Sequence, residues 1–246
     1  MTDPAHRARL VARFGAAVAE PWLAALPALA SSLAAAWSLG VADAIPAGGT
    51  SVVLRCTRAD GSRALLKLTP DPALAAAEAT ALRAWAPTSA VPTLLAADPA
   101  AGALLLEALP TETTLRDAPG APASPAALRG LLDRLHAVAP PPGTPPLRER
   151  VAFVFDLWTP RRPALAATRD RALALADDPA APHVLLHGDL HPGNVIDAGP
   201  PRGLVAIDPR PCAGDPAFDA VDFPELAHLP RVAAWREALA PLLAPA

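Results

Sequence analysis

The feature that most constrains this chain is a polar loop, His187–Asn194, set between very short apolar segments. The flanking segments Val184–Leu186, Val195–Ile196 and Val205–Ile207 are too short to form a sheet with a core of its own. We therefore expect short strands inserted into a mainly helical region, where neighbouring helices supply the packing. A loop pinned between such strands presents its polar side chains at one point.

The first half of the chain has a different pattern, in which apolar strands are joined by turns. Strands are predicted at Val52–Cys56 and Ala64–Leu68, and Arg58–Gly61 between them contains Asp-Gly, a strong hairpin signal. Thr93–Ala97 and Ala103–Ala108 are predicted as two further strands. Together these segments predict a small antiparallel sheet.

Apolar residues at helical spacing predict helices on both sides of this sheet. The predicted helices are residues 5–39 with interruptions near Pro21 and Pro27, Pro72–Trp85, Pro125–Val138 with Ser124 as N-cap, Arg148–Leu157, Pro163–Asp177 and Arg231–Leu243. The order of elements predicts an α+β fold with two lobes, residues 1–109 and 110–246. Lobes joined near Leu106–Pro110 would leave a cleft, which is where ligands tend to bind.

The bulk composition excludes several classes of protein. Hydrophobic residues make up 52% of the chain, which is enough for a buried core, and the net charge of -3 argues against nucleic-acid binding. No signal peptide is expected in Met1–Arg13, and Pro, Arg or Asp breaks every long apolar run, so no membrane span is expected. Cys56 and Cys212 fit no metal or redox spacing. We expect a cytoplasmic monomer or weak dimer.

The polar loop contains His187, Asp189 and Asn194 at the H-x-D-x-x-x-x-N spacing of a kinase catalytic loop. Phosphoryl transfer to an alcohol needs a carboxylate beside the incoming hydroxyl, and Asp189 is the candidate base. It also needs oxygen ligands for Mg²⁺, and the candidates are Asn194 and Asp208, which ends the apolar segment Leu204–Ile207.

These residues resemble the aminoglycoside phosphotransferase family, in the branch of streptomycin kinases. The resemblance is carried by residues 186–195, 206–211 and 214–219, and in the first half by residues 64–68, 78–85 and 104–107. It extends from about Trp22 to about Glu225 and implies a bilobal protein-kinase-like fold that uses ATP and Mg²⁺. The implied reaction is phosphorylation of a hydroxyl on a cationic small molecule, most simply an aminoglycoside such as streptomycin.

The first half holds the residues expected to bind the nucleotide. Lys67, the only lysine in the sequence, lies between leucines on what should be an inner face, where its ammonium needs a partner such as Glu78. The resemblance implies that this pair holds the α- and β-phosphates. It also implies a phosphate-covering loop, which comprises Gly48, Gly49, Thr50 and Ser51. The adenine is expected to bind the backbone groups of Glu107 and Leu109.

The acceptor is expected to meet an acidic segment after the magnesium ligand. Its carboxylates are Asp215, Asp219, Asp222 and Glu225. One of the first two is expected to brace the catalytic loop, and the others could pair with guanidinium groups of a streptomycin-like acceptor. Relatives in this branch have a longer helical tail and a longer helical insert before the loop, so we expect a shallow acceptor site with weak affinity.

Three other interpretations are open. The acceptor could be a sugar, a nucleoside, an amino alcohol or another antibiotic. The chain could be a nucleotide-binding pseudokinase, although Lys67, Glu78, Asp189, Asn194 and Asp208 are all present. His187-x-Asp189-x-His191 could also be part of a zinc hydrolase site, although the other histidines form no second cluster in the sequence.

Overall fold

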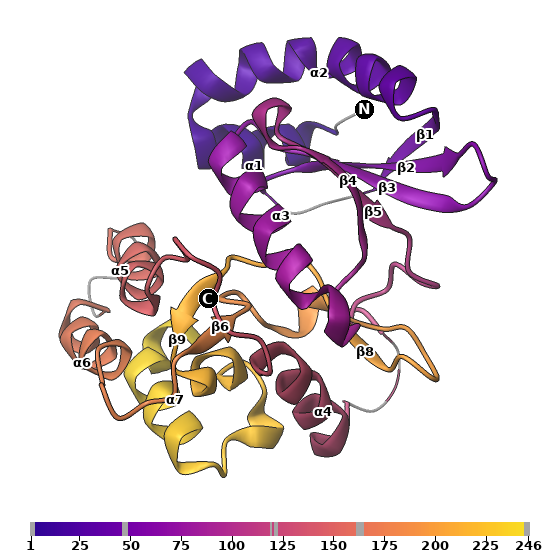
Figure 1. Cartoon of the computed structure of the whole chain (residues 1–246). Helices are drawn as coiled ribbons and strands as arrows, with labels where there is room; N and C mark the ends of the chain where they lie inside the picture. The colour runs from indigo at the N-terminus through magenta and orange to yellow at the C-terminus, as the bar shows by residue number, and fades with distance from the viewer. Residues whose placement is uncertain (1–2, 46–48, 119, 121–122, 161–164, 244–246) are drawn as a thin grey trace. The chain divides into compact units, whose positions relative to one another are not determined.

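The computed structural model divides the chain into two compact units (Figure 1). The first comprises Met1–Ala79 and Pro92–Leu109, and the second comprises Thr80–Val91 and Pro110–Ala246. The structure describes all residues except 1–2, 46–48, 119, 121–122, 161–164 and 244–246. Each unit is described below by itself.

The first unit contains a five-stranded antiparallel sheet in the order β1-β2-β3-β5-β4. Its strands are β1 (Leu39–Ile45), β2 (Val52–Arg58), β3 (Arg63–Leu68), β4 (Leu94–Asp98) and β5 (Ala103–Glu107). The hairpin between β2 and β3 confirms the predicted turn, since Gly61 adopts φ 80° and donates to the carbonyl of Arg58 at 2.9 Å. Strand β1 was not predicted.

Two helices, α1 (Pro4–Phe14) and α2 (Ala16–Ala36), pack on the sheet of the first unit. The core is built from helix residues such as Leu10, Leu26 and Leu33 and from strand residues such as Leu54 and Leu66. Burial of these apolar side chains is the main force that holds the helices on the sheet.

The predicted helix over residues 5–39 was interrupted at the wrong place. The chain breaks at Gly15, which adopts φ 80°, and α2 continues through both Pro21 and Pro27. By length and composition alone, α2, which has 21 residues, is long and apolar enough to cross a membrane. This differs from the expectation that Pro, Arg or Asp would break every long apolar run. Leu26 and Leu33 of this helix are buried in the core of the unit.

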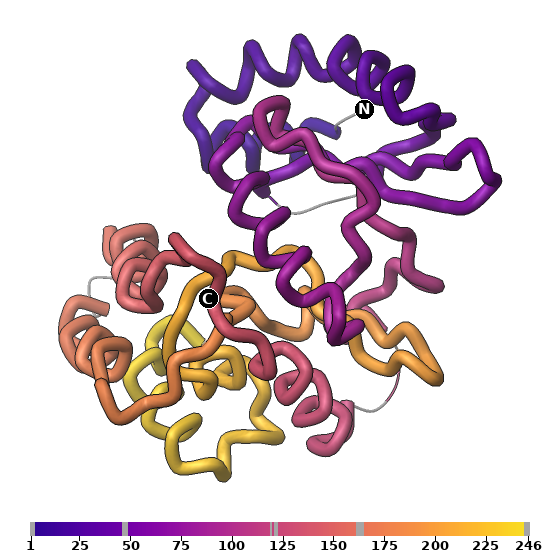
Figure 2. The backbone as a smooth tube through the Cα atoms, in the orientation of Figure 1, coloured from indigo at the N-terminus to yellow at the C-terminus, as the bar shows by residue number. Residues whose placement is uncertain are grey.

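The second unit is mainly helical. It contains α4 (Pro125–His136), α5 (Leu147–Trp158), α6 (Ala166–Ala176) and α7 (Pro230–Leu243), together with the end of α3 (Pro72–Trp85). Ser124 caps α4 as predicted, because its hydroxyl accepts from the Ala127 amide at 3.2 Å. Figure 2 shows the backbone of α5, α6 and α7 side by side, and they share a core that includes Val151, Phe155 and Trp235.

Two small antiparallel sheets lie within this helical unit. Strand β6 (Val184–Leu186) pairs with β9 (Cys212–Gly214), and β7 (Val195–Asp197) pairs with β8 (Leu204–Ala206). Three of these strands confirm the predicted short segments, whereas β9 was not predicted. The polar loop begins directly after β6 and ends at β7, so both of its ends are fixed by strand pairing.

Candidate active site

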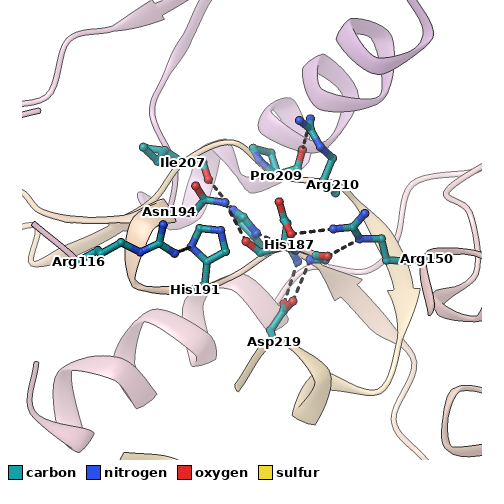
Figure 3. A network of polar contacts seen from close by, with 11 residues as sticks. Arg116, Arg150, His187, His191, Asn194, Ile207, Pro209, Arg210 and Asp219 are labelled. Atoms are coloured by element: carbon teal, nitrogen blue, oxygen red, sulfur yellow. Dashed lines mark hydrogen bonds and ion pairs between the residues drawn. The ribbon is translucent and has the colours of Figure 1, made fainter. Parts of the chain in front are cut away.

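Figure 3 shows His187, His191 and Asn194 of the loop 187–194. The loop turns sharply at Gly188, which adopts φ 76°. A Cβ atom at this position would lie 2.0 Å from the carbonyl oxygen of Arg210, so only glycine fits here. The loop is also tied to the segment after β8, because the Arg210 amide donates to the His187 carbonyl at 2.7 Å.

His187 is buried and serves the loop as a structural residue. Its Nε2 donates to the carbonyl of Ile207 at 2.8 Å, and its Nδ1 accepts from the amide of Asp189 at 3.3 Å. Burial lowers the pKa of His187, despite the opposing charges of nearby carboxylates. The neutral ring therefore uses both nitrogens inside the protein, which does not suit a zinc ligand.

Asp219 holds the beginning of the loop, as expected of one carboxylate in the acidic segment. It accepts from the amides of His187 and Gly188, both at 2.8 Å, and lies 3.0 Å from Nε2 of His136. Burial opposes its ionisation, but the hydrogen bond and charge of His136 and the backbone donors hold the pKa of Asp219 below its ordinary value.

Asp189 is the one carboxylate within the loop, and 36% of its side-chain surface is exposed. One of its oxygens, Oδ1, accepts from Nη2 of Arg150 at 2.7 Å. Exposure of this kind allows a substrate hydroxyl to approach, as a candidate base requires.

Asn194 connects the two segments that carry the candidate metal ligands. Its Nδ2 donates to the carbonyl of Asp189 at 2.9 Å, which leaves its Oδ1 directed elsewhere, and its carbonyl accepts from the amide of Ile207 at 2.9 Å. Asp208 follows Ile207 directly and adopts φ 57°. Strained backbone of this kind is concentrated at functional sites.

The donor set fits Mg²⁺, which prefers oxygen ligands and retains several waters. Asn194 can offer an amide oxygen and Asp208 a carboxylate, so phosphate and water would complete the shell. Within the described part of the chain, no three His, Cys, Asp or Glu side chains gather as a metal-binding group. A zinc site of the His187–His191 type is therefore not formed there.

His191 lies on the same loop but is held by a different contact. Its Nδ1 accepts from the amide of Gly193 at 3.1 Å and from Nη2 of Arg116 at 3.0 Å. Burial lowers the pKa of His191, and the charge of Arg116 acts in the same direction while Asp189 opposes it.

In the first unit, Lys67 and Glu78 form the ion pair that their positions predicted. Lys67 Nζ lies 2.7 Å from both carboxylate oxygens, and the two side chains are only 5% and 3% exposed. Strand β3 and helix α3 bring them together, and their role toward nucleotide stays a prediction.

The other expected nucleotide residues also lie in the first unit. Gly48 is outside the described residues, while Gly49, Thr50 and Ser51 lead into β2. The Ser51 carbonyl accepts from Nε2 of the buried His6, which fastens this segment to α1. Glu107 ends β5 and Leu109 follows it.

The acidic segment divides into two kinds of carboxylate. Asp215 is buried and accepts from Nε of Arg231 and from Nε1 of Trp235, both at 2.6 Å. Like Asp219, it is occupied inside the protein, so the structure does not support acceptor binding by either.

Asp222 and Glu225 are half-buried, and their side chains form no hydrogen bond or ion pair with other described residues. Burial raises the pKa of Asp222, and Asp189 adds to this effect while His191 opposes it.

Sequence reasoning missed Arg150, Arg116 and His136. Each reaches the loop or its brace from far along the chain, with sequence separations of 39, 75 and 83 residues. No local motif marks them. For His136 and Arg150 the available signal was that each directly neighbours a buried apolar residue of its helix, Leu135 in α4 and Val151 in α5, whereas Arg116 lies in no helix.

Comparison with known proteins agrees with this geometry. Residues 36–226 match the family described as aminoglycoside/hydroxyurea antibiotic resistance kinase. The chain is 38% identical to a streptomycin 6-kinase of Streptomyces glaucescens over 81% of this chain and 67% of that protein. It is also 38% identical to a hydroxyurea phosphotransferase of Kitasatospora aureofaciens over 88% of this chain and 66% of that protein.

The fold is also similar to that of a solved structure. Choline kinase LicA from Streptococcus pneumoniae superposes with a TM-score of 0.59 at 16% identity, covering 88% of this chain and 79% of that chain. This likeness shows an α+β fold of the protein-kinase-like type. With the family match over most of its length, the chain belongs to the aminoglycoside/hydroxyurea antibiotic resistance kinases.

Proposed function

We propose that this kinase transfers the γ-phosphoryl group of ATP to a hydroxyl group of a streptomycin-like aminoglycoside. The observation that carries the proposal is the braced loop 187–194, which presents Asp189 and Asn194 beside the segment that bears Asp208. The identity of 38% to a streptomycin 6-kinase supports the choice of acceptor.

In this proposal Asp189 orients the acceptor hydroxyl and receives its proton as the oxygen attacks the phosphorus. Asn194 and Asp208 would hold Mg²⁺, which would supply positive charge that neutralises the phosphates. The buried brace made by Asp219 fixes the loop before substrates arrive. Catalysis then consists mainly of positioning and charge stabilisation.

The nucleotide is assigned to the first unit. Lys67, oriented by Glu78, would contact the α- and β-phosphates, and the backbone of the segment from Gly48 to Ser51 would cover them. The backbone groups of Glu107 and Leu109 would bind adenine. Because the reaction consumes ATP, we also place it in the cytoplasm.

The acceptor is assigned to Asp222 and Glu225, the carboxylates of the acidic segment whose side chains form no hydrogen bond or ion pair with other described residues. A guanidinium group forms two parallel hydrogen bonds with a carboxylate, and streptomycin carries such groups. The pairing would orient one hydroxyl toward Asp189.

A second acceptor, hydroxyurea, is favoured by one specific observation. The hydroxyurea phosphotransferase relative is as similar in sequence as the streptomycin 6-kinase, at 38% identity. Hydroxyurea is small and uncharged, so its binding would not depend on carboxylates. Salt dependence of the acceptor KM therefore separates the two alternatives, since salt screens exposed charge pairs.

The test is to incubate the protein with ATP, Mg²⁺ and one acceptor, which is streptomycin, hydroxyurea or an uncharged sugar, and to measure phosphorylated product by mass spectrometry. We expect a phosphorylated streptomycin product, and no product from the Asp189→Ala variant. Transfer to hydroxyurea or to an uncharged sugar without transfer to streptomycin would overturn the aminoglycoside acceptor. It would leave the kinase assignment in place.

A further inference from the structure

Arg150, the fourth residue of helix α5, makes two contacts with the catalytic loop (Figure 3). Its Nη2 donates to Oδ1 of Asp189 at 2.7 Å, and its Nε donates to the carbonyl of Gly188 at 2.7 Å. One planar guanidinium thus binds the candidate base and the backbone that carries it. Such a two-point contact fixes the orientation of the Asp189 carboxylate as well as its distance from the guanidinium.

The part of helix α5 that carries Arg150 is firmly packed in the second unit. Leu147, Val151 and Phe155 of α5 are almost completely buried in the core of the second unit. Leu147 also packs tightly on Gly214 of β9, where a Cβ atom would lie 2.6 Å from the Cβ of Leu147. The guanidinium lies 5.6 Å from the ring centre of Phe153, within range of a cation–π contact.

Arg150 differs from an ordinary surface ion pair. Exposed pairs contribute little, because solvent screens them and two side chains lose freedom. Arg148, on the same helix, forms such a pair with Asp177, and both side chains are about half exposed at 51% and 47%. The Arg150 side chain is only 16% exposed. Its partner is the carboxylate that the proposed reaction uses.

We propose that Arg150 is a positioning residue for phosphoryl transfer, an inference that rests on the proposed function. By holding Oδ1, it leaves Oδ2 of Asp189 to meet the hydroxyl of the acceptor. A carboxylate free to rotate would present either oxygen over a range of directions, and a misplacement of about 1 Å can cost on the order of 10²-fold in rate.

An ion pair at the base is compatible with this chemistry. The phosphoryl group passes through a loose transition state, in which the attacking oxygen has formed little bond to phosphorus and the hydroxyl still holds most of its proton. Under these conditions the carboxylate matters more for orientation than for basicity. Its pairing with arginine therefore costs little in rate.

The same pair has a consequence for the choice of acceptor. A guanidinium already occupies the side of Asp189 that a cation would seek. The charged groups of a cationic acceptor must then bind elsewhere, and only its neutral hydroxyl approaches Asp189. This agrees with an acceptor held by Asp222 and Glu225, whose side chains form no hydrogen bond or ion pair with other described residues.

The test compares Arg150→Ala, Arg150→Met and Arg150→Lys with Arg148→Ala, a matched control on the same helix. Turnover is measured with the acceptor that the wild type uses, and also without acceptor, where water takes the phosphoryl group. We expect kcat of Arg150→Ala and Arg150→Met to fall by about 10²-fold, with the KM for ATP and the Tm nearly unchanged. Arg150→Lys should recover part of kcat, and Arg148→Ala should match the wild type.

Added guanidinium ion tests whether Arg150 acts on kcat itself, because a purely structural role of Arg150 would predict no recovery of kcat. It should raise kcat of Arg150→Ala, whose cavity it can enter, and should not raise kcat of Arg150→Met or Arg148→Ala. Arg150→Ala with kcat within twofold of the wild type would overturn the inference. A loss of kcat that merely parallels a fall in Tm would also overturn it. Absence of transfer to streptomycin, with acceptor-independent ATP turnover still dependent on Arg150, would overturn only the acceptor. A wild type that turns over no ATP would overturn both proposals.

Discussion

The ammonium group of Lys67 lies 2.7 Å from both carboxylate oxygens of Glu78, and both side chains are almost fully buried. We expect Lys67→Met to reduce turnover more than Glu78→Gln, because the lysine would contact phosphate directly whereas the glutamate only orients it. The measurement is kcat and the KM for ATP of each variant, with Tm as the control for folding. Equal or greater damage from Glu78→Gln would contradict this division of roles.

Lys67 can also be tested without mutation. It is the only lysine in the sequence, so an amine-directed reagent can modify only this side chain and the terminal amino group. Bound ATP should slow modification of Lys67, because phosphate would cover its ammonium group. The terminal amino group serves as the internal control in the same mass spectrum. Equal labelling of Lys67 with and without ATP would remove it from the nucleotide site.

The metal assignment predicts that activity depends on Mg²⁺ or Mn²⁺. Asp208→Asn keeps a residue that tolerates the observed φ of 57° while removing the charge, and Asn194→Ala removes the amide oxygen. Both variants should need a higher concentration of divalent ion for half-maximal rate. Asp197→Asn, an exposed aspartate at the end of β7, is the matched control. An unchanged metal requirement in both site variants would contradict the assignment.

Asp219 is expected to link stability to pH. It accepts from two buried amides and from His136, so Asp219→Asn should leave buried donors unsatisfied. We expect the free energy of unfolding at neutral pH to fall by about 1–3 kcal/mol, measured by urea denaturation with tryptophan fluorescence.

The pKa of Asp219 is lowered in the folded state, which gives the sign of the pH effect. Its contribution is fully present above the unfolded pKa of about 3.9 and is lost as the pH falls toward the folded value. The stability difference between the wild type and Asp219→Asn should therefore shrink below about pH 4. A difference that stays constant down to pH 3 would show that the charge of Asp219 is not what stabilises the loop.

Local patterns were sufficient to predict much of the fold. Helix α3 was predicted at Pro72–Trp85, as observed, and Ser124 was identified as the N-cap of α4. Strand β1 was missed because Leu39–Ile45 is largely exposed and contains Gly40 and Asp43, so it shows no apolar alternation. Its strand conformation depends on pairing with β2. Strand β9 has three residues and is likewise defined by its partner, β6.

The residues of the candidate site could likewise be predicted only in part from local sequence patterns. Asp189 and Asn194 are recognisable because their spacing within one loop carries the signal. Arg150 is not, because its contact with Asp189 spans 39 residues and depends on how α5 packs. The sequence also could not distinguish the four carboxylates of the acidic segment. Burial against Arg231, Trp235 and His136 is what separates Asp215 and Asp219 from the other two.

The last prediction concerns Asp222, the half-buried carboxylate near Asp189, His191, Arg116 and Arg236. If Asp222 pairs with a cationic group of the acceptor, Asp222→Asn should raise the KM for streptomycin severalfold and leave the KM for ATP unchanged. The effect should weaken at high salt to the extent that the pair is exposed. Glu237→Gln removes an exposed carboxylate on α7 that pairs with Arg171, and it serves as the control.

The pH dependence of the same KM gives an independent check. Burial raises the pKa of Asp222, so its protonation begins at a higher pH than for an ordinary aspartate. The protonated acid cannot attract a guanidinium group, and the acceptor KM of the wild type should therefore rise on acidification from above pH 4. Asp222→Asn, which has no charge to lose, should show a flatter profile over the same range. Parallel profiles for the two proteins, or a KM for streptomycin that Asp222→Asn leaves unchanged, would show that the acceptor does not bind this carboxylate.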